Sequence, residues 1–379
     1  MTGLMVRERE TLEKYIPGLL AYLDEAPLAQ LEARDSNAVD KFREFGGTGL
    51  VVPAELGGLG APAIDAVRAQ RAIGSRSPSL GAGTTMHHLS LASLTEFARG
   101  ATEDDRGATE DDRALIKGLV EQKAIVASGF SEGVTGGSVF IPTMTAVKKG
   151  DNYIVNGSKK PCSLARSMDL LTCSVEIDSG DRAVALIPAS LPGISVKPFW
   201  TTDILAGAQS EEVVLDDVEV PASLVLPNKD DDPDGVHEMT GYLWFGMLIS
   251  ANYIGAATSL LERMIEQDKG DHEGYVRAAA ELETSMAAIE NVARAFDEGE
   301  RGQDISVRLL FNRIAIRDAL VRSSSAAIES LGGIGFIKSP EIAYVAAALH
   351  AFAFHPPSRR SISETLARFH AGDEFAFVK

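Results

Sequence analysis

The sequence predicts an α+β protein in which an antiparallel sheet lies between two helical regions. Three observations lead to this prediction. Apolar residues recur at helical spacing up to about residue 120, short β-branched runs follow as far as about residue 226, and long helical patterns then return. A chain of 379 residues with 45% hydrophobic content is large and apolar enough to bury a substantial core.

The first region, residues 1–122, is predicted to be a helical domain. An early helix is indicated by apolar residues at helical spacing, namely Leu12, Tyr15, Ile16, Leu19 and Leu20. Pro53, Gly57-Gly58 and Pro62 mark loops. The segment Arg99–Asp105 is repeated at once as Arg106–Asp112. We interpret the second copy as a tandem duplication on a solvated surface with no catalytic role.

The second region, residues 123–228, is predicted to be a sheet domain. Gly150-Asp151-Asn152 separates two strand-like runs and predicts a hairpin. Further short apolar runs, divided by turn residues, lie at 170–175, 183–187 and 212–215. The acidic stretch 230–235 is interpreted as a linker to the last region.

The third region, residues 236–379, is predicted to be a helical bundle with helices at 237–267, 275–297 and 304–331. Asp304 is a plausible N-cap and Gly332-Gly333 a plausible stop for the last of these. Residues 239–261 carry no charge and are long enough to span a membrane. Because they contain five Ser, Thr or Asn residues and three glycines, we predict a central helix buried on all sides instead.

Charge and cysteine usage limit the functional classes. A net charge of −18 argues against nucleic-acid binding, which needs a basic face. The two cysteines, Cys162 and Cys173, predict neither a disulfide framework nor a zinc site. The first 25 residues contain no apolar signal-peptide core. We therefore expect a cytoplasmic protein that binds no nucleic acid and does not enter a membrane.

Two glycine-bearing segments give the strongest functional signal. They are Ser128-Gly-Phe-Ser-Glu-Gly-Val-Thr-Gly-Gly-Ser138, followed by the hairpin and Asn156-Gly-Ser-Lys-Lys-Pro-Cys-Ser163, and Leu331-Gly-Gly-Ile-Gly-Phe336. In this order and spacing, and with residues 42–60, they resemble the acyl-CoA dehydrogenase family over residues 10–357. The resemblance implies a helical domain, a central antiparallel β-barrel and a C-terminal four-helix bundle. It also implies an FAD cofactor and a homodimer or homotetramer.

The resemblance also implies cofactor-binding positions. The segment of Phe130, Ser131, Gly136 and Gly137 would place a hydroxyl and backbone amides against the flavin ring. Ser163 stands where the family has a Thr hydroxyl near the reactive flavin nitrogen N5, and Pro161 replaces the family's Trp. Gly332 and Gly333 match an element that approaches the FAD pyrophosphate from a partner subunit, where a glycine allows close contact. Without the resemblance, Ser131 and Ser163 are better interpreted as ordinary strand-end or turn serines.

Two departures from the family pattern concern its charged residues. Asp271 and Gly274 stand where most members supply an Arg and a Phe to the neighbouring FAD, so the usual pyrophosphate clamp is missing. The family's catalytic glutamate is absent from both of its known places, where this chain has His355 and Phe245. His355 is a candidate replacement base, with a helix-end histidine as the alternative interpretation. His87, His88 and His350 are interpreted as core or loop histidines and not as metal ligands.

Three functions remain compatible with the sequence. The first is an FAD-dependent oxidoreductase acting on a specialised acyl thioester or related small metabolite, which passes electrons to an unidentified acceptor. The second is a reduced-flavin monooxygenase of the same fold, supplied by a flavin reductase and able to dispense with the glutamate. The third is a flavin-free member that only binds a ligand or performs non-redox chemistry.

Overall fold

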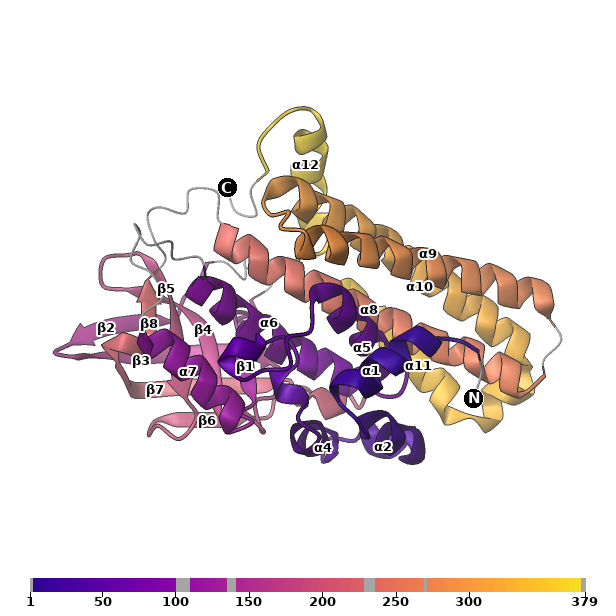
Figure 1. The fold of residues 1–379 in the computed structure, drawn as a ribbon, viewed down its shortest axis with the longest axis horizontal. Helices are drawn as coiled ribbons and strands as arrows, with labels where there is room; N and C mark the ends of the chain where they lie inside the picture. Colours follow the sequence, from indigo (N-terminus) through magenta and orange to yellow (C-terminus); the bar gives the residue numbers. More distant parts are fainter. Residues whose placement is uncertain (1–2, 100–109, 135–140, 228–235, 269–270, 376–379) are drawn as a thin grey trace.

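The computed structural model describes residues 3–99, 110–134, 141–227, 236–268 and 271–375. The sheet lies at one end of the molecule, and the long C-terminal helices extend away from it (Figure 1). The proposed duplication, the acidic linker and two predicted site residues, Gly136 and Gly137, fall largely or wholly outside the described residues. The division into three domains stays a prediction, although the elements change from helix to strand between Glu121 and Val126.

Helices make up the part that precedes the sheet. In chain order they are α1 (Val6–Tyr15), α2 (Leu19–Glu25), α3 (Leu28–Leu31), α4 (Ala38–Glu44), η1 (Gly47–Gly49), η2 (Ala54–Leu56), α5 (Ala63–Gly74), α6 (Pro78–Arg99) and α7 (Glu110–Glu121). Leu12, Ile16 and Leu19 are fully buried, as their apolar spacing predicts. They do not share one helix, because α1 ends at Tyr15 and α2 begins at Leu19.

The central sheet has eight strands. They are β1 (Val126–Gly129), β2 (Thr145–Lys149), β3 (Asn152–Cys162), β4 (Leu170–Ile177), β5 (Arg182–Pro188), β6 (Ile194–Lys197), β7 (Glu211–Pro221) and β8 (Val225–Pro227). Their order is β6-β7-β3-β2-β4-β5-β8, and β1 pairs with β4. The predicted hairpin is confirmed, since β2 and β3 pair antiparallel around Gly150, whose φ is 63°.

The expected antiparallel β-barrel is not what the structure shows. The sheet is mixed, because β1 and β2 both pair parallel with one edge of β4, β1 along Leu170–Cys173 and β2 along Glu176 and Ile177. A barrel also needs its first and last strands to hydrogen-bond to each other. Within the described residues the short end strands β6 and β8 pair only with β7 and β5, so the sheet stays open.

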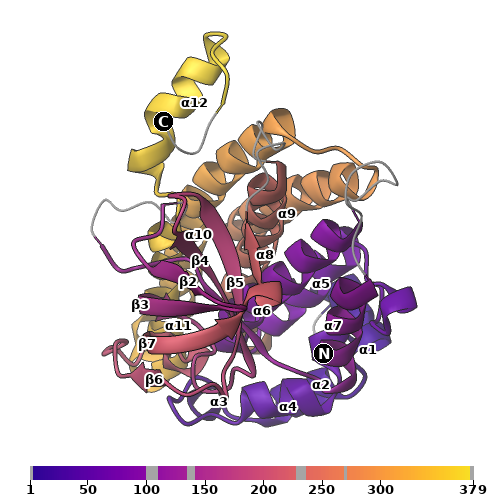
Figure 2. The same cartoon turned by 90° about the vertical axis from the view of Figure 1, so that its left-hand side faces the viewer.

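The C-terminal part is helical. Its elements are α8 (Val236–Glu266), α9 (His272–Asp297), α10 (Gln303–Lys338), α11 (Pro340–His350), η5 (Ala351–Phe354) and α12 (Arg359–His370). The three helices predicted from the sequence correspond to α8, α9 and α10. The predicted stop at Gly332 is a kink, with φ 75° and ψ 166°, after which the helix resumes. Figure 2 shows α12 standing out from the body beside α10.

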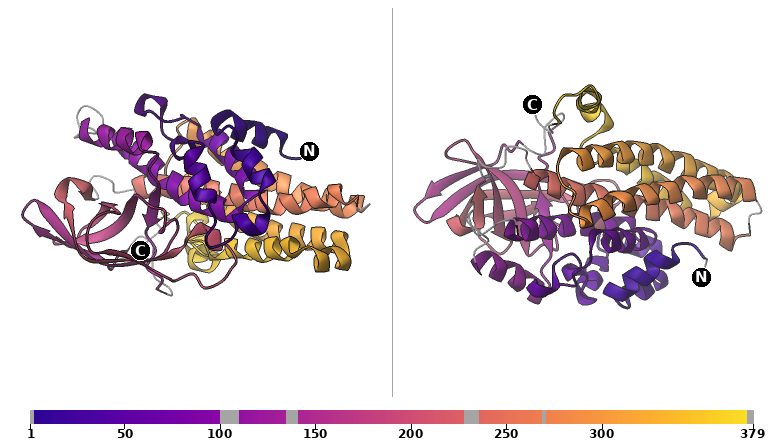
Figure 3. Two further views of the ribbon diagram at one scale, coloured as in Figure 1. Left: turned by 90° about the horizontal axis from the view of Figure 1, so that it is seen from below. Right: turned by 45° about the horizontal axis from the view of Figure 1, so that its top comes forward.

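Helix α8 is the core of the molecule. It is long and apolar enough to cross a membrane, but residues 239–261 are buried inside the protein, with only Gly241 partly exposed. Helices α5 and α6 pack on one side of it and α9, α10 and α11 on the other, an arrangement visible in the right-hand view of Figure 3. This agrees with the expectation of a central buried helix.

Two glycines let α5 and α8 cross in close contact. A Cβ added at Gly255 of α8 would lie 2.0 Å from the carbonyl oxygen of Arg71, and one at Gly74 of α5 would lie 2.2 Å from the carbonyl oxygen of Asn252. Both distances are far below any allowed contact. The backbones of these helices therefore touch at a place where no side chain fits.

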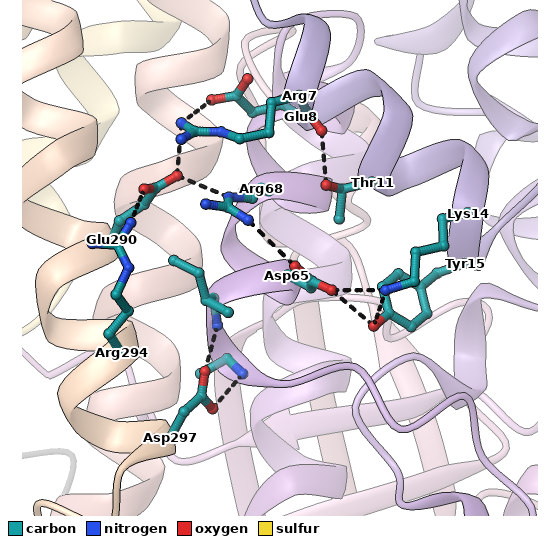
Figure 4. Close-up of polar contacts among 12 residues, drawn as sticks. Arg7, Glu8, Thr11, Lys14, Tyr15, Asp65, Arg68, Glu290, Arg294 and Asp297 are labelled. Carbon is teal, nitrogen blue, oxygen red and sulfur yellow. Dashed lines mark hydrogen bonds and ion pairs between the residues drawn. The ribbon is translucent and has the colours of Figure 1, made fainter.

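Ion pairs and hydrogen bonds join the N-terminal helices α1 and α5 to helix α9 (Figure 4). Glu290 of α9 pairs with Arg7 at 2.8 Å, Arg68 at 2.9 Å and Arg294 at 2.8 Å. Asp297 at the end of α9 accepts hydrogen bonds from the amides of Ala63 and Ile64, which caps the start of α5. The α1, α5 and α9 helices are thus held in one relative orientation.

We predict that Gly255→Ala separates α5 from α8. The added methyl group meets backbone, which cannot rotate away, so the free energy of unfolding should fall by about 3 kcal/mol or more. Urea unfolding monitored by circular dichroism measures the change. Gly118→Ala in α7 is the matched control, because its Cβ has open space and alanine favours a helix by about 1 kcal/mol. Equal stability of the two variants would contradict the proposed close crossing.

Candidate functional site

The segment after β1 carries the first predicted site residues. Phe130 and Ser131 are half-buried where the strand ends. The Ser131 carbonyl accepts a hydrogen bond of 2.9 Å from the Lys160 amide, which ties this segment to β3. Among the residues that the structure describes, the Ser131 hydroxyl has no hydrogen-bond partner. Its backbone is thus fixed while its hydroxyl is available to a ligand.

A buried ion pair holds this segment in place. The Lys159 side chain is fully buried, and its Nζ donates to Glu132 Oε1 at 2.7 Å and to Ser174 Oγ at 3.1 Å. Glu132 also accepts hydrogen bonds from the Thr143 amide and hydroxyl. Burial by itself would raise the pKa of Glu132, but the hydrogen bonds from Lys159 and Thr143 lower it to about 2. The carboxylate therefore stays ionised and keeps Ser131 in position.

Ser163 lies just after β3. Its hydroxyl is half-buried and lies 2.9 Å from the Ser210 hydroxyl. The next residue, Leu164, has a φ of 64° and donates its amide hydrogen to the Ala208 carbonyl. Ser210 and Ala208 belong to the connection that leads into β7. Ser163 is thus positioned by backbone far away in the sequence, which no local motif indicates.

A histidine in α6 holds the start of β1. His87 Nδ1 accepts a hydrogen bond of 3.0 Å from the Val126 amide, and His87 Nε2 donates to the Thr48 carbonyl at 2.9 Å. These partners fix the neutral form with its proton on Nε2. Burial lowers the pKa of His87 to about 4. The neighbouring His88 is fully buried, and within the part of the chain that the structure describes neither of its ring nitrogens has a hydrogen-bond partner; burial lowers its pKa well below the ordinary value.

The structure brings together the two places where the family resemblance expects a catalytic glutamate. The rings of Phe245, on α8, and His355, after η5, have centroids 6.0 Å apart. The Tyr253 hydroxyl, two turns along α8 from Phe245, shares a hydrogen bond of 2.9 Å with His355 Nε2. Among the described residues, no aspartate or glutamate contacts either ring.

His355 remains uncharged in this environment. Although part of the residue reaches solvent, its imidazole packs among aromatic rings. Burial lowers its pKa to about 3, and the nearby Arg313 charge acts in the same direction. The candidate base His355 is therefore a neutral imidazole at any pH well above 3. Burial also raises the pKa of Tyr253, so the pair carries no charge.

Arg313 of α10 is the charged residue beside this pair. Only 6% of it is exposed. Its guanidinium donates to the Tyr242 hydroxyl at 2.7 Å and to the carbonyls of Pro356 and His355 at 3.1 and 3.3 Å. It also lies 5.3 Å from the ring centre of Phe245. A buried cation and several aromatic rings thus surround the two positions.

The glycines at the far end of α10 lie on an open surface. A Cβ at Gly332 or Gly333 would have no atom within 4 Å, and the following Ile334 and Ile337 are 66% and 77% exposed. Asp271 caps α9 by accepting from the Gly274 amide at 2.9 Å and from the Ser330 hydroxyl at 2.6 Å. The residue that replaces the family's arginine is therefore occupied in capping a helix.

Sequence comparison adds an independent line of evidence. No protein-family model matches the chain. Isobutylamine N-hydroxylase from Streptomyces viridifaciens is 44% identical over 370 residues, which cover 96% of this chain and 97% of that protein. Mitochondrial isovaleryl-CoA dehydrogenase from Bos taurus is 26% identical over 362 residues, which cover 87% of this chain and 79% of that protein.

The chain belongs to the acyl-CoA dehydrogenase family of flavin-dependent oxidoreductases. A solved structure supports the same fold. FMN-bound TdsC from Paenibacillus sp. A11-2 has a TM-score of 0.80 and 18% identity, with coverage of 98% of this chain and 99% of that one. The family resemblance and the flavin oxidoreductase class inferred from the sequence are thus confirmed.

Sequence reasoning missed Tyr253 and Arg313. Arg313 lies in a helix rich in arginines and has no distinguishing motif, so nothing in the sequence separated it from surface arginines. Tyr253 follows Phe245 by two helical turns, so both lie on one face of α8. This spacing could have pointed to Tyr253, but only after Phe245 had been recognised as a site position.

We predict that the buried histidines make the fold sensitive to acid. The folded pKa of His87, about 4, lies below the unfolded value of about 6.5, so the unfolded state binds more protons between these values. The pKa of His88 is shifted in the same direction. Stability should therefore be full above about pH 6.5 and fall as the pH approaches 4.

The variant His88→Leu tests this sensitivity. It removes two unpaired buried nitrogens and one acid-sensitive group, so the dependence of stability on pH should become shallower by up to about 1.4 kcal/mol per pH unit. Urea unfolding at several pH values between 4 and 7 measures the slope. Replacement of the exposed His272 by Gln serves as the control. An unchanged slope in His88→Leu would show that His88 does not carry this effect.

Proposed function

We propose that this protein is a reduced-flavin-dependent monooxygenase that hydroxylates the nitrogen of a small primary amine. The observation that carries the proposal is the pairing of Phe245 with a neutral His355 where the family resemblance expects a glutamate. The 44% identity to isobutylamine N-hydroxylase supports the same reaction type and substrate class. A small alkylamine also suits a site lined by aromatic rings.

The chemistry of the site argues against α,β-desaturation of an acyl thioester. That reaction needs a base strong enough to remove a proton from carbon. A histidine whose pKa is about 3 accepts protons weakly, and Phe245 accepts none. The interpretation of His355 as a replacement base in a dehydrogenase therefore has less support than the monooxygenase.

Nitrogen hydroxylation makes a different demand. The amine must offer a lone pair, so it must react unprotonated, although a free alkylammonium has a pKa of about 10.4 in water. Burial and the positive charge of Arg313 favour the neutral form of a bound amine, as they do for His355. Tyr253 and His355 are joined by a hydrogen bond and present uncharged polar groups that orient the amine.

The reaction balances with the reactants named. One amine, one O2 and two hydrogens from the reduced flavin give one hydroxylamine, one water and oxidised flavin. When bound, a reduced flavin supplies the two electrons that let one oxygen atom form a bond to nitrogen and the other leave as water. The protein's own residues bind the amine, keep it neutral and exclude water from the aromatic site.

Several features of the chain fit a flavin. The Ser131 hydroxyl has no partner among the described residues, and Ser163 provides a second hydroxyl at the end of β3. Gly332 and Gly333 offer open backbone that a partner subunit could use, which agrees with the proposed homodimer or homotetramer. We propose FAD as the cofactor and a separate flavin reductase as the partner that supplies it reduced.

An acyl-thioester dehydrogenase remains the second candidate. The 26% identity to isovaleryl-CoA dehydrogenase favours it. Such an enzyme passes electrons to an acceptor and needs no supplied reductant. The two functions therefore differ in whether the enzyme consumes O2 and reduced flavin.

We predict that the purified protein converts isobutylamine to its hydroxylamine when given O2, FAD and a flavin reductase with NADH. Mass spectrometry of the product detects the added oxygen atom. His355→Gln should lower kcat/KM for the amine about tenfold, the worth of one hydrogen bond of about 1.4 kcal/mol, with flavin affinity unchanged. In the unmodified protein the rate should show no inflection near pH 6.5. Desaturation of isovaleryl-CoA without supplied reductant would instead establish the dehydrogenase.

We predict that the double variant Ser131→Ala/Ser163→Ala binds flavin more weakly. Loss of two hydrogen bonds, at about 0.5–1.5 kcal/mol each, should raise the dissociation constant between about 5-fold and 150-fold. Quenching of flavin fluorescence measures binding without any substrate. The control is Ser179→Ala, an exposed turn serine between β4 and β5. Unchanged flavin affinity would identify both predicted residues as ordinary turn serines.

A further inference from the structure

We propose that Glu32 and Tyr344 are positioning residues for the Ser163 hydroxyl. They act through the connection between β6 and β7, at the turn that runs from Leu205 to Ser210. The inference rests on the proposed contact of Ser163 with the flavin, and it adds to that function two residues far from Ser163 in the sequence. Glu32 directly follows α3, and Tyr344 lies on α11.

Glu32 is a buried carboxylate on which several donors converge. Only 3% of it is exposed, and no basic residue pairs with it among those that the structure describes. Its Oε1 accepts from the Ser77 hydroxyl at 2.6 Å, and its Oε2 accepts from the Ser79 hydroxyl at 2.6 Å. The Ser79 amide, in the first turn of α6, lies 3.1 and 3.2 Å from the two oxygens. The positive end of the α6 dipole therefore stabilises the carboxylate and helps to fix its position.

Tyr344 connects this carboxylate to the turn. Its hydroxyl accepts a hydrogen bond of 2.9 Å from the Leu205 amide. Because an amide N–H only donates, the hydroxyl proton is left for the Glu32 carboxylate, to which Tyr344 is also hydrogen-bonded. Burial and the Glu32 charge both raise the pKa of Tyr344, so the hydroxyl keeps this proton. Tyr344 thus joins Leu205 to Glu32.

The turn needs such support from outside. Leu205 and Gln209, on either side of η3, have φ values of 60° and 53°. Left-handed backbone is unfavourable for residues with a side chain, so these conformations persist only where surrounding contacts impose them. Between them, the Gly207 amide donates to the Glu32 carbonyl at 3.1 Å. The backbone of Glu32 holds the turn directly, and its side chain holds the turn through Tyr344.

The far end of the turn contacts the segment of Ser163. The Ala208 carbonyl accepts a hydrogen bond of 3.0 Å from the Leu164 amide. The Ser210 and Ser163 hydroxyls lie 2.9 Å apart. A hydrogen bond between two hydroxyls uses the proton of only one of them. When Ser210 donates, Ser163 keeps its own proton for a ligand, so the place of Ser210 decides how the Ser163 hydroxyl is oriented.

Tyr344→Phe tests the proposal, because it breaks the connection at one point and leaves the contacts between Glu32 and α6 intact. The dissociation constant of oxidised FAD, measured by quenching of flavin fluorescence, should rise about 3-fold to 10-fold, the range expected for one weakened hydrogen bond. The absorption spectrum of bound FAD should shift in the same direction as in Ser163→Ala. Tyr22→Phe is the matched control, because it loses a hydroxyl hydrogen bond of 2.8 Å to Asn37 and should change neither quantity.

A double-mutant cycle separates positioning from a general structural role. When Ser163 is already alanine, Tyr344→Phe should change the dissociation constant by less than about twofold, because the hydroxyl that it positions is gone. Glu32→Gln provides the same test at the other end of the connection. It keeps the size of the side chain but presents an amide group to donors that need an acceptor. Urea unfolding checks that each variant is folded under the conditions of the binding measurement.

Equal losses of FAD affinity from Tyr344→Phe with and without the Ser163 hydroxyl would overturn the proposal. An FAD affinity unchanged by Tyr344→Phe would overturn it as well. If Ser163→Ala alone leaves the affinity unchanged, the flavin contact of Ser163 and this inference are refuted together. Neither measurement involves the amine, so failure to form a hydroxylamine would refute the monooxygenase and leave the positioning role in place.

Discussion

The rest of the structure depends on the need to bury α8 on every side. Residues 239–261 of this helix contain no charge, so each face requires a packing partner. Helices from both ends of the chain supply these partners, and the close approach at Gly74 and Gly255 allows α5 to lie directly on the α8 backbone. Because α8 cannot shift, Phe245 and Tyr253 are presented from a rigid element, as a reactive site requires.

Two buried arginines show how the same residue type serves structure and function. Arg71 is 1% exposed and pairs with Glu8 and Glu283, so its charge is neutralised within the fold. Arg313 is 6% exposed and has only neutral acceptors. The first joins α5 to α1 and α9. The second has no carboxylate partner among the described residues, and its charge helps to lower the pKa of the neighbouring His355.

The sequence predicted the order of elements well and their closure poorly. The long helices and the β2–β3 hairpin follow from periodicity and turn residues, which are local properties. The closed barrel is not confirmed because strand pairing is not local: β1 and β2 share one edge of β4, and within the described residues the strands at the two ends do not pair. Gly332 was expected to end a helix, but α10 continues after a kink at this residue. A glycine with positive φ is typical both of a helix end and of a kink, so the residue type alone does not distinguish the two.

The sequence by itself determined the family, and through the family resemblance it predicted His355 and Phe245 at the two places of the catalytic glutamate. Both follow from residue type and spacing, which the chain carries without folding. The tertiary structure decided that Phe245 and His355 meet, that His355 is neutral and that Arg313 is buried with no carboxylate partner among the described residues. Each of these depends on contacts between residues that are far apart in the sequence. His355 and Arg313 are shielded from water only when α8, α10 and the segment after η5 pack together.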